Sequence, residues 1–191
     1  LRSEFGWSIS EENVAITNGS QSAFFMLLNL FAGTDDDGRM GRVLFPLLPE
    51  YIGYGDQALG ADAFRAVRPA IEQIDPHTHK YHVDFDRLTI TEDITAICVS
   101  RPTNPSGNVL TDGEIARLDA LAAEHGVPLL VDNAYGTPFP DIIFTDAQPS
   151  WNENTVLTMS LSKIGLPSVR TGIVIAPPEI ARALTAMNAV L

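Results

Sequence analysis

The two runs that decide the fold are Thr95-Ala96-Ile97-Cys98-Val99-Ser100 and Val127-Pro128-Leu129-Leu130-Val131. Both are short and apolar, which is typical of buried strands. Residues 111–125 between them are predicted to form an amphipathic helix, which Thr111 and Glu114 cap at its start and Gly126 closes. A strand, a helix and a second strand in this order indicate parallel strands joined by a crossover helix.

The same alternation of strand-like and helix-like segments continues on both sides of this unit. We predict a helical turn or short helix at residues 51–59, helices at residues 21–31 and from residues 177–178 onward, and strands at residues 14–17, 42–45, 64–67, 155–159 and 172–176. Residues 69–93 are expected to form a connection with little regular structure and one short strand at residues 82–85. The pattern predicts an α/β three-layer sandwich with a mostly parallel sheet and crossover helices, as one domain over residues 1–191.

Composition narrows the classes of function. The chain carries 24 acidic and 12 basic side chains, a formal net charge of −12. Such an acidic chain is not expected to bind nucleic acid or an anionic membrane surface, and no apolar run approaches the roughly 18 residues of a membrane span. The single cysteine, Cys98, lies in a strand-like run. We expect it to be a buried core residue, and we expect no disulfide framework and a reducing, cytoplasmic setting.

Polar residues follow five of the predicted strands. In open α/β sheets, ligands bind beyond the carboxyl ends of the strands, so these residues are expected to meet at one edge of the sheet. Their convergence is stronger evidence than any single motif. The segments are Asn18-Gly19-Ser20-Gln21, Pro49-Glu50-Tyr51, Asn104, Asp132 with Tyr135, and Ser160-Leu161-Ser162-Lys163.

The last of these segments and Arg170 carry the groups that a phosphorylated aldehyde needs. The Lys163 amine can form a Schiff base with the aldehyde, and the side chains of Ser160, Ser162 and Arg170 can bind the phosphate. The helix start at Gly19-Ser20-Gln21 offers backbone N–H groups, a hydroxyl and a positive dipole end to the same phosphate. These residues therefore predict a ligand with an aldehyde at one end and a phosphate at the other.

The remaining residues fit an aromatic ring with a basic nitrogen. Asp132 ends an apolar strand, where a carboxylate is costly unless it is paired, and a protonated pyridine nitrogen would be such a partner. Tyr135 and Asn104 can hydrogen-bond a phenolate oxygen, and Tyr51 can stack on the ring. Together with the phosphate-binding groups, these residues predict pyridoxal 5'-phosphate as the cofactor.

Plainer interpretations exist for each residue taken alone. Asp132 can be a turn aspartate, Lys163 a surface lysine, and Gly19-Ser20 an ordinary helix start. The chain would then be a doubly wound domain without a cofactor, which the five coincident segments disfavour. Three histidines within residues 77–82 have no regular spacing on one face and no cysteine nearby. We expect a surface loop there and no metal site.

With these residues placed, the chain resembles the class I/II aminotransferases of fold type I, which depend on pyridoxal 5'-phosphate. The resemblance covers nearly the whole chain, which corresponds to the large cofactor-binding domain. The separations fit the family pattern: 28 residues from Asn104 to Asp132, three from Asp132 to Tyr135, three from Ser160 to Lys163, and seven from Lys163 to Arg170.

The resemblance implies ping-pong transamination between an amino acid, such as valine or alanine, and a 2-oxo acid, such as pyruvate, in a homodimer. Lys163 would bind the cofactor and act as a general base, Asp132 would keep the pyridine nitrogen protonated, and Tyr135 would bond the phenolate. The other implied cofactor-binding residues are Gly19, Ser20, Gln21, Tyr51, Asn104, Ser160, Ser162 and Arg170.

The resemblance also implies an N-terminal segment and a C-terminal small domain that this chain does not include, so the chain alone is expected to turn over poorly. The small domain would supply an arginine for the substrate carboxylate.

Two other classes of function stay open. A lyase or decarboxylase of fold type I would use the same cofactor anchors, because the bond that breaks depends on how the substrate is oriented. A non-catalytic module that binds pyridoxal 5'-phosphate or dimerises, such as the sensor part of a regulator, would also keep them.

Overall fold

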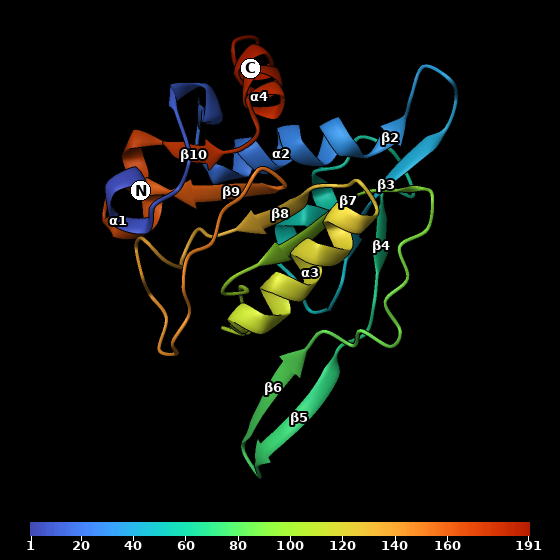
Figure 1. Ribbon diagram of the computed structural model, residues 1–191, viewed down its shortest axis with the longest axis vertical. Coiled ribbons are helices and arrows are strands. Elements are labelled where there is room, and N and C mark those ends of the chain that lie inside the picture. Colours follow the sequence, from blue (N-terminus) through green and yellow to red (C-terminus); the bar gives the residue numbers. More distant parts are fainter.

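The computed structural model describes residues 1–191, whose backbone is built on an eight-stranded sheet (Figure 1). The order across the sheet is β1-β10-β9-β8-β7-β3-β2, with β4 beside β3. Each of the strands predicted outside residues 69–93 is present, within two residues of the expected ends. The strands are β1 Val14–Thr17, β2 Gly33–Thr34, β3 Met40–Phe45, β4 Phe64–Ala66, β7 Ile94–Ser100, β8 Leu129–Asp132, β9 Thr155–Ser160 and β10 Gly172–Ile175.

The direction of the strands decides where a site can form. The neighbours β4, β3, β7, β8 and β9 are parallel, which confirms the mostly parallel sheet. β10 is antiparallel to both β9 and β1, and β2 is antiparallel to β3. β1 therefore points in the same direction as β4, β3, β7, β8 and β9. As a result, the carboxyl ends of β1, β3, β7, β8 and β9 and the amino end of β10 lie at one edge of the sheet.

Helices cover both faces of the sheet, which confirms the three-layer sandwich (Figure 1). α2 Ser20–Phe31 and α4 Pro178–Asn188 pack on one face, and α3 Asp112–Glu124 packs on the other. A hydrophobic core lies on each face of the sheet, and successive side chains of β7 belong to the two cores in turn. Ala96 and Cys98 belong to the α2 side, whereas Ile97 and Val99 belong to the α3 side. Cys98 is fully buried and free, as expected for a small core residue.

The start of α3 has the predicted capping box. The Glu114 N–H donates to Thr111 Oγ1 at 3.1 Å, and the Thr111 N–H donates to Glu114 Oε2 at 2.8 Å. These bonds satisfy backbone groups that a helix end leaves unpaired. The remaining short helices are α1 Arg2–Phe5 and the 3₁₀ turns η1 Glu11–Asn13, η2 Ile52–Asp56, η3 Leu161–Ile164 and η4 Pro167–Val169.

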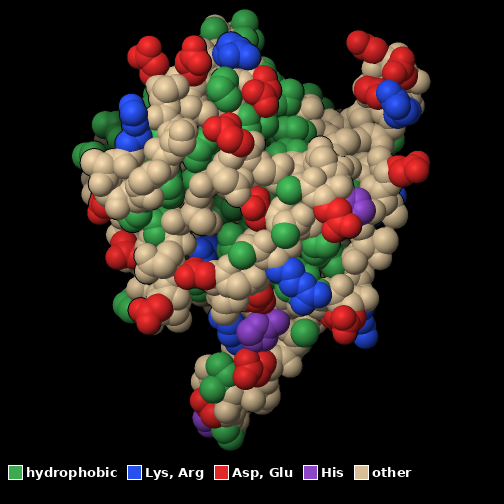
Figure 2. Space-filling view, in the orientation of Figure 1, with side chains coloured by type: hydrophobic (Ala, Val, Ile, Leu, Met, Phe, Trp, Pro, Cys, Tyr) green, Lys and Arg blue, Asp and Glu red, His purple; other side chains and the backbone are tan.

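The prediction for residues 69–93 was wrong. This segment contains a hairpin of β5 Ala70–Asp75 and β6 Thr78–His82, which form a two-stranded sheet of their own and project from the body (Figure 2). All of β5 is exposed. Because β5 is exposed throughout and only the end of β6, at Tyr81, packs against a core, the sequence lacks the alternation of apolar and polar residues that marks a half-buried strand. The turn is set locally, since the His77 N–H donates to Asp75 Oδ1 at 2.7 Å.

The surface agrees with the acidic composition. Figure 2 shows the acidic side chains scattered over one face of the molecule, with Lys and Arg side chains among them, rather than gathered into a single patch. Scattered charge of this kind favours solubility. None of the helices combines the length and the apolar character needed to cross a membrane.

Candidate active site

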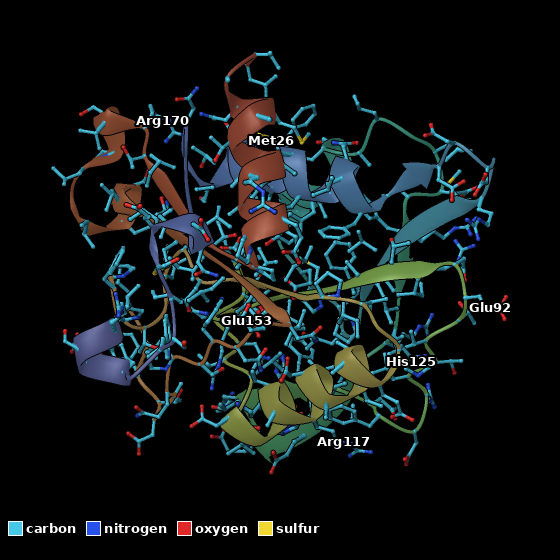
Figure 3. All side chains as sticks on the ribbon, turned by 45° about the horizontal axis from the view of Figure 1, so that its top comes forward. Met26, Glu92, Arg117, His125, Glu153 and Arg170 are labelled. Carbon is cyan, nitrogen blue, oxygen red and sulfur yellow. The ribbon has the colours of Figure 1, made fainter.

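The predicted site residues come together at the edge of the sheet where the parallel strands end. Figure 3 shows Arg170, which precedes β10, on one side of the molecule, and Glu92 and His125, which precede β7 and β8, on the other. Arg170 reaches the carboxyl edge because β10 runs opposite to its neighbours. The antiparallel direction of β10 therefore brings the Arg170 guanidinium to the edge where the carboxyl ends of β1, β3, β7, β8 and β9 lie.

A cavity of about 270 Å³ opens at this edge. Every residue predicted to bind the cofactor lines it except Gly19, whose backbone lies beside it at the start of α2. The lining residues among the predicted set are Ser20, Gln21, Tyr51, Asn104, Asp132, Tyr135, Ser160, Ser162, Lys163 and Arg170.

One end of the cavity is built to hold an anion. Gly19 has no side chain to cap α2, so the N–H groups of the first helical turn keep no side-chain partner. The Arg170 guanidinium lies against Gly19, and its Nη1 donates to Ser162 Oγ at 3.3 Å. The Ser160 hydroxyl oxygen accepts from the Ser162 N–H at 3.2 Å, which leaves its hydrogen free to donate. These donors fit a phosphate.

The middle of the cavity holds the only lysine near the site. Lys163 lies in η3, directly after β9, and its Nζ is 4.9 Å from the centre of the Tyr135 ring. Its side chain is exposed to solvent through the cavity mouth. The amine is therefore close to an aromatic face and open to a small molecule that enters the cavity.

The inner end of the cavity carries a half-buried carboxyl. Asp132, at the end of β8, accepts a hydrogen bond from the Tyr54 hydroxyl at 2.6 Å and one from the Ala134 N–H at 3.0 Å. Burial raises the pKa of the Asp132 carboxyl, although these hydrogen bonds and the Lys163 charge oppose the rise. No ion pair in the structure includes Asp132. A cationic ligand group would supply the missing partner.

Comparison with known proteins agrees with this geometry. The family described as "Aminotransferase class I and II" matches residues 8–190. The chain belongs to the class I and II aminotransferase family. It is 59% identical over 191 residues to a valine–pyruvate aminotransferase of Escherichia coli, covering 100% of this chain and 46% of that protein. The chain thus spans about half the length of this curated relative.

Two solved structures of aminotransferases share the fold. A valine–pyruvate aminotransferase from Salmonella typhimurium matches with a TM-score of 0.91 and 54% identity, over 100% of this chain and 47% of that one. A protein described as a putative amino-acid aminotransferase from Psychrobacter arcticum matches with a TM-score of 0.95 and 47% identity, over 100% and 46%. These matches confirm the predicted resemblance to the aminotransferases and the predicted fold.

Pyridoxal 5'-phosphate, the cofactor of this aminotransferase family, fits the residues present. The anion-binding end suits its phosphate, Lys163 suits its aldehyde, and Asp132 suits a protonated ring nitrogen. A further sign is Gln57, which lines the same cavity, is 6% exposed, and has no partner for either polar atom of its side chain. An unpaired buried amide is costly, so a ligand or water is expected beside it.

The aminotransferase site contains residues that the sequence analysis missed. Tyr54, Gln57 and Ser100 line the cavity. Glu50, which the sequence analysis placed in one of the five polar segments without giving it a role, is buried behind the cavity at 8% exposure. A carboxyl within the otherwise apolar stretch around Glu50 was a usable signal, because buried carboxyls need a reason. Tyr54 and Gln57 gave no such signal, since a tyrosine and a glutamine in a turn are ordinary surface residues.

The histidines lie away from the site. His82, at the end of β6, contacts two carboxylates, with Nε2 2.8 Å from Glu72 Oε2 and Nδ1 3.2 Å from Glu114 Oε1. His79 packs edge-on against Tyr81. No group of three or more His, Cys, Asp or Glu side chains has the arrangement of a metal site.

Replacing Gly19 by alanine is expected to weaken cofactor binding about 10-fold. An added Cβ would lie 2.5 Å from Arg170 Nη2, and the φ of Gly19 is +93°, which a side chain rarely tolerates. Arg170 would have to leave its place at the helix start. Fluorescence titration with pyridoxal 5'-phosphate measures the change. Gly6→Ala is the matched control, because Gly6 also has a positive φ but open space around it. Equal affinity in the Gly19 and Gly6 variants would contradict the assignment.

Replacing Glu50 by glutamine is expected to change the stability of the cofactor-free chain more favourably at pH 8 than below pH 4.5, by about 3 kcal/mol. Burial, with a smaller contribution from Asp132, raises the pKa of Glu50 from 4.5 to about 7. Between these values the native state keeps a proton that the unfolded state has released, so stability falls as pH rises and the loss is complete above about 7. Urea unfolding below pH 4.5 and at pH 8 measures this. A difference between variant and parent that does not grow with pH would contradict it.

Proposed function

We propose that the protein is a pyridoxal 5'-phosphate-dependent aminotransferase that exchanges an amino group between valine or alanine and a 2-oxo acid such as pyruvate. The observation that carries the proposal is the cavity at the carboxyl edge of the sheet, where Lys163, Asp132 and the anion-binding group around Arg170 converge. The names of the relatives that share 59% and 54% identity support the choice of substrates.

The residues have separate roles in this proposal. Gly19, Ser20, Gln21, Ser160, Ser162 and Arg170 hold the phosphate and so fix the cofactor's position in the cavity. When bound, the cofactor supplies an aldehyde that takes the amino group and a ring that stabilises negative charge at the substrate α-carbon. Tyr51 would stack on the ring, while Asn104 and Tyr135 would donate hydrogen bonds to the ring's oxygen.

Lys163 is the proposed covalent anchor and general base. Its Nζ would hold the cofactor's aldehyde in the absence of substrate, and once displaced by a substrate amine the neutral Nζ would act as the general base that takes the proton from the substrate α-carbon. Asp132 keeps the ring nitrogen protonated, because its buried carboxylate gains a charged partner there. Tyr54 holds Asp132 in place through their 2.6 Å hydrogen bond.

We propose a cytoplasmic homodimer as the working form. Several apolar side chains next in sequence to cavity-lining residues are exposed, among them Ile52 at 86%, Val169 at 52% and Leu166 at 46%. Exposed apolar groups of this kind favour an interface with a second copy. The single buried cysteine supports a reducing compartment. Light scattering coupled to size exclusion measures the oligomeric state.

A product assay tests the proposed reaction. The purified protein with pyridoxal 5'-phosphate, L-valine and pyruvate is expected to yield alanine and the 2-oxo acid of valine in equal amounts. Release of carbon dioxide with an amine would indicate a decarboxylase instead. If the cofactor binds and none of these products forms with any amino acid and 2-oxo acid pair, also when the assayed protein includes a small domain that supplies the substrate arginine, the protein is a non-catalytic binding module, and the proposal is wrong.

A further inference from the structure

Glu50 is a buried carboxyl next to the cofactor site with no role in the reaction described above. It is 8% exposed and directly precedes Tyr51, the residue proposed to lie on the cofactor ring. Its Oε1 accepts from the Ser100 N–H at 2.9 Å, and its Oε2 accepts from the Tyr51 N–H at 3.2 Å. One carboxyl therefore connects the segment that follows β3 to the end of β7.

Ser100 continues this connection to Asp132. The Ser100 hydroxyl and the Tyr54 hydroxyl are 3.0 Å apart, and the Tyr54 hydroxyl donates to Asp132 Oδ2 at 2.6 Å. Tyr54 is 2% exposed and Ser100 is 2% exposed, so water does not compete for these bonds. The chain of contacts from Glu50 to Asp132 is thus continuous, and it is largely shielded from bulk water.

The charges in this region do not balance without a ligand. Neither Glu50 nor Asp132 belongs to any ion pair in the structure. The titratable groups that act on them are each other, the Tyr54 hydroxyl, the Cys98 thiol and, for Asp132, the Lys163 amine. Asp132 lines the inner end of the cavity, Glu50 is buried behind it, and Lys163 is the one cation that acts on either. A negative charge on Glu50 behind a negative charge on Asp132 is unfavourable in free energy unless a cation binds beside them.

We propose that Glu50 is a positioning residue for the cofactor's ring nitrogen, acting through Ser100, Tyr54 and Asp132 and adding a second negative charge behind Asp132. This inference rests on the proposed function, since it assumes that pyridoxal 5'-phosphate occupies the cavity. The arriving pyridinium stabilises both carboxylates, and both carboxylates hold the proton on the nitrogen. The hydrogen bond from the Tyr51 N–H to Glu50 also fixes the position of the Tyr51 backbone relative to the Glu50 carboxyl.

The proton on the ring nitrogen is the direct readout. Protein loaded with ¹⁵N-labelled pyridoxal 5'-phosphate is titrated by ¹⁵N NMR, which separates the protonated from the neutral nitrogen. In Glu50→Gln, the pH at which the nitrogen loses its proton is expected to fall by about one unit relative to the parent. Glu50→Asp, which keeps the charge, is expected to restore most of the difference. Glu50→Ala removes the charge without the amide and is expected to show the same fall as Glu50→Gln.

Glu114→Gln is the matched control. Glu114 is also a partly buried carboxylate that accepts from two backbone N–H groups, those of Thr111 and Val83, but it lies outside the cavity lining. It is expected to leave the nitrogen's titration unchanged. An unchanged titration in Glu50→Gln and Glu50→Ala, with the cofactor bound, would overturn this inference and leave the proposed function intact. A parent protein that does not bind the cofactor would overturn both.

Discussion

Replacing Lys163 by alanine lowers the rate of amino transfer by about 10⁴-fold or more. The variant loses both proposed roles of Nζ, the covalent hold on the cofactor and the proton transfer at the substrate α-carbon. Lys163 is exposed, and none of the hydrogen bonds or ion pairs of the structure involves its side chain, so its removal should not harm the fold. Turnover of valine and pyruvate, measured beside a thermal unfolding curve, tests the prediction.

The chain offers an unusually clean control for this variant. Its only other lysine, Lys80, lies on the projecting hairpin, where Nζ donates to the Val109 carbonyl at 2.7 Å. Lys80→Ala is expected to keep full turnover. Addition of a small primary amine is expected to restore part of the activity of Lys163→Ala, because the amine can carry the missing proton. Retained transamination in Lys163→Ala without such an amine would refute the assigned role.

Replacing Asp132 by asparagine lowers turnover by about 10³-fold while it raises the stability of the cofactor-free chain at neutral pH. Asparagine keeps the shape and can still accept from the Ala134 N–H. It cannot carry the charge that holds a proton on the ring nitrogen. The loss should therefore appear in kcat as well as in kcat/KM, because the Asp132 charge stabilises the transition state.

The opposite effect on stability follows from the direction of the pKa shift. Burial raises the pKa of Asp132, so the native state holds a proton above pH 3.8 that the unfolded state has lost. Stability therefore falls as pH rises from 3.8 through the folded pKa, and asparagine removes this loss. Asp119→Asn, on the surface where Asp119 accepts from Asn152, is the control and should change neither quantity greatly. Parallel losses of turnover and stability in Asp132→Asn would contradict the account.

The central sheet could be predicted from the sequence because its strands are buried. Runs such as residues 95–100 are short, apolar and separated by a capped helix, and these signals are local. The edge at which the polar segments meet followed from a general rule for parallel strands, since all of them come after predicted strands. The roles of Lys163 and Asp132 were inferred from residue type and position together, and they stay predictions until measured.

The parts that could not be predicted depend on contacts between distant segments. β5 and β6 satisfy each other's backbone groups while β5 is exposed and β6 is at most half-buried, so no apolar alternation marks them. Glu50 hydrogen-bonds Ser100, which lies 50 residues away in the sequence, and Tyr54 hydrogen-bonds Asp132, which lies 78 residues away. These contacts define the roles of both residues and exist only in the folded chain. A glutamate in a loop is usually a surface residue, and only the folded chain shows that this one is buried.

The measurement that tests the central claim most directly is cofactor attachment. Pyridoxal 5'-phosphate is added to the purified chain, the visible absorbance is recorded, borohydride is added, and the labelled peptide is identified by mass spectrometry. The account predicts a visible band that borohydride removes, with the cofactor then bound permanently to Lys163 and not to Lys80. A folded chain that shows no band, or a label on Lys80 alone, would contradict the assignment of this cavity as a pyridoxal 5'-phosphate site.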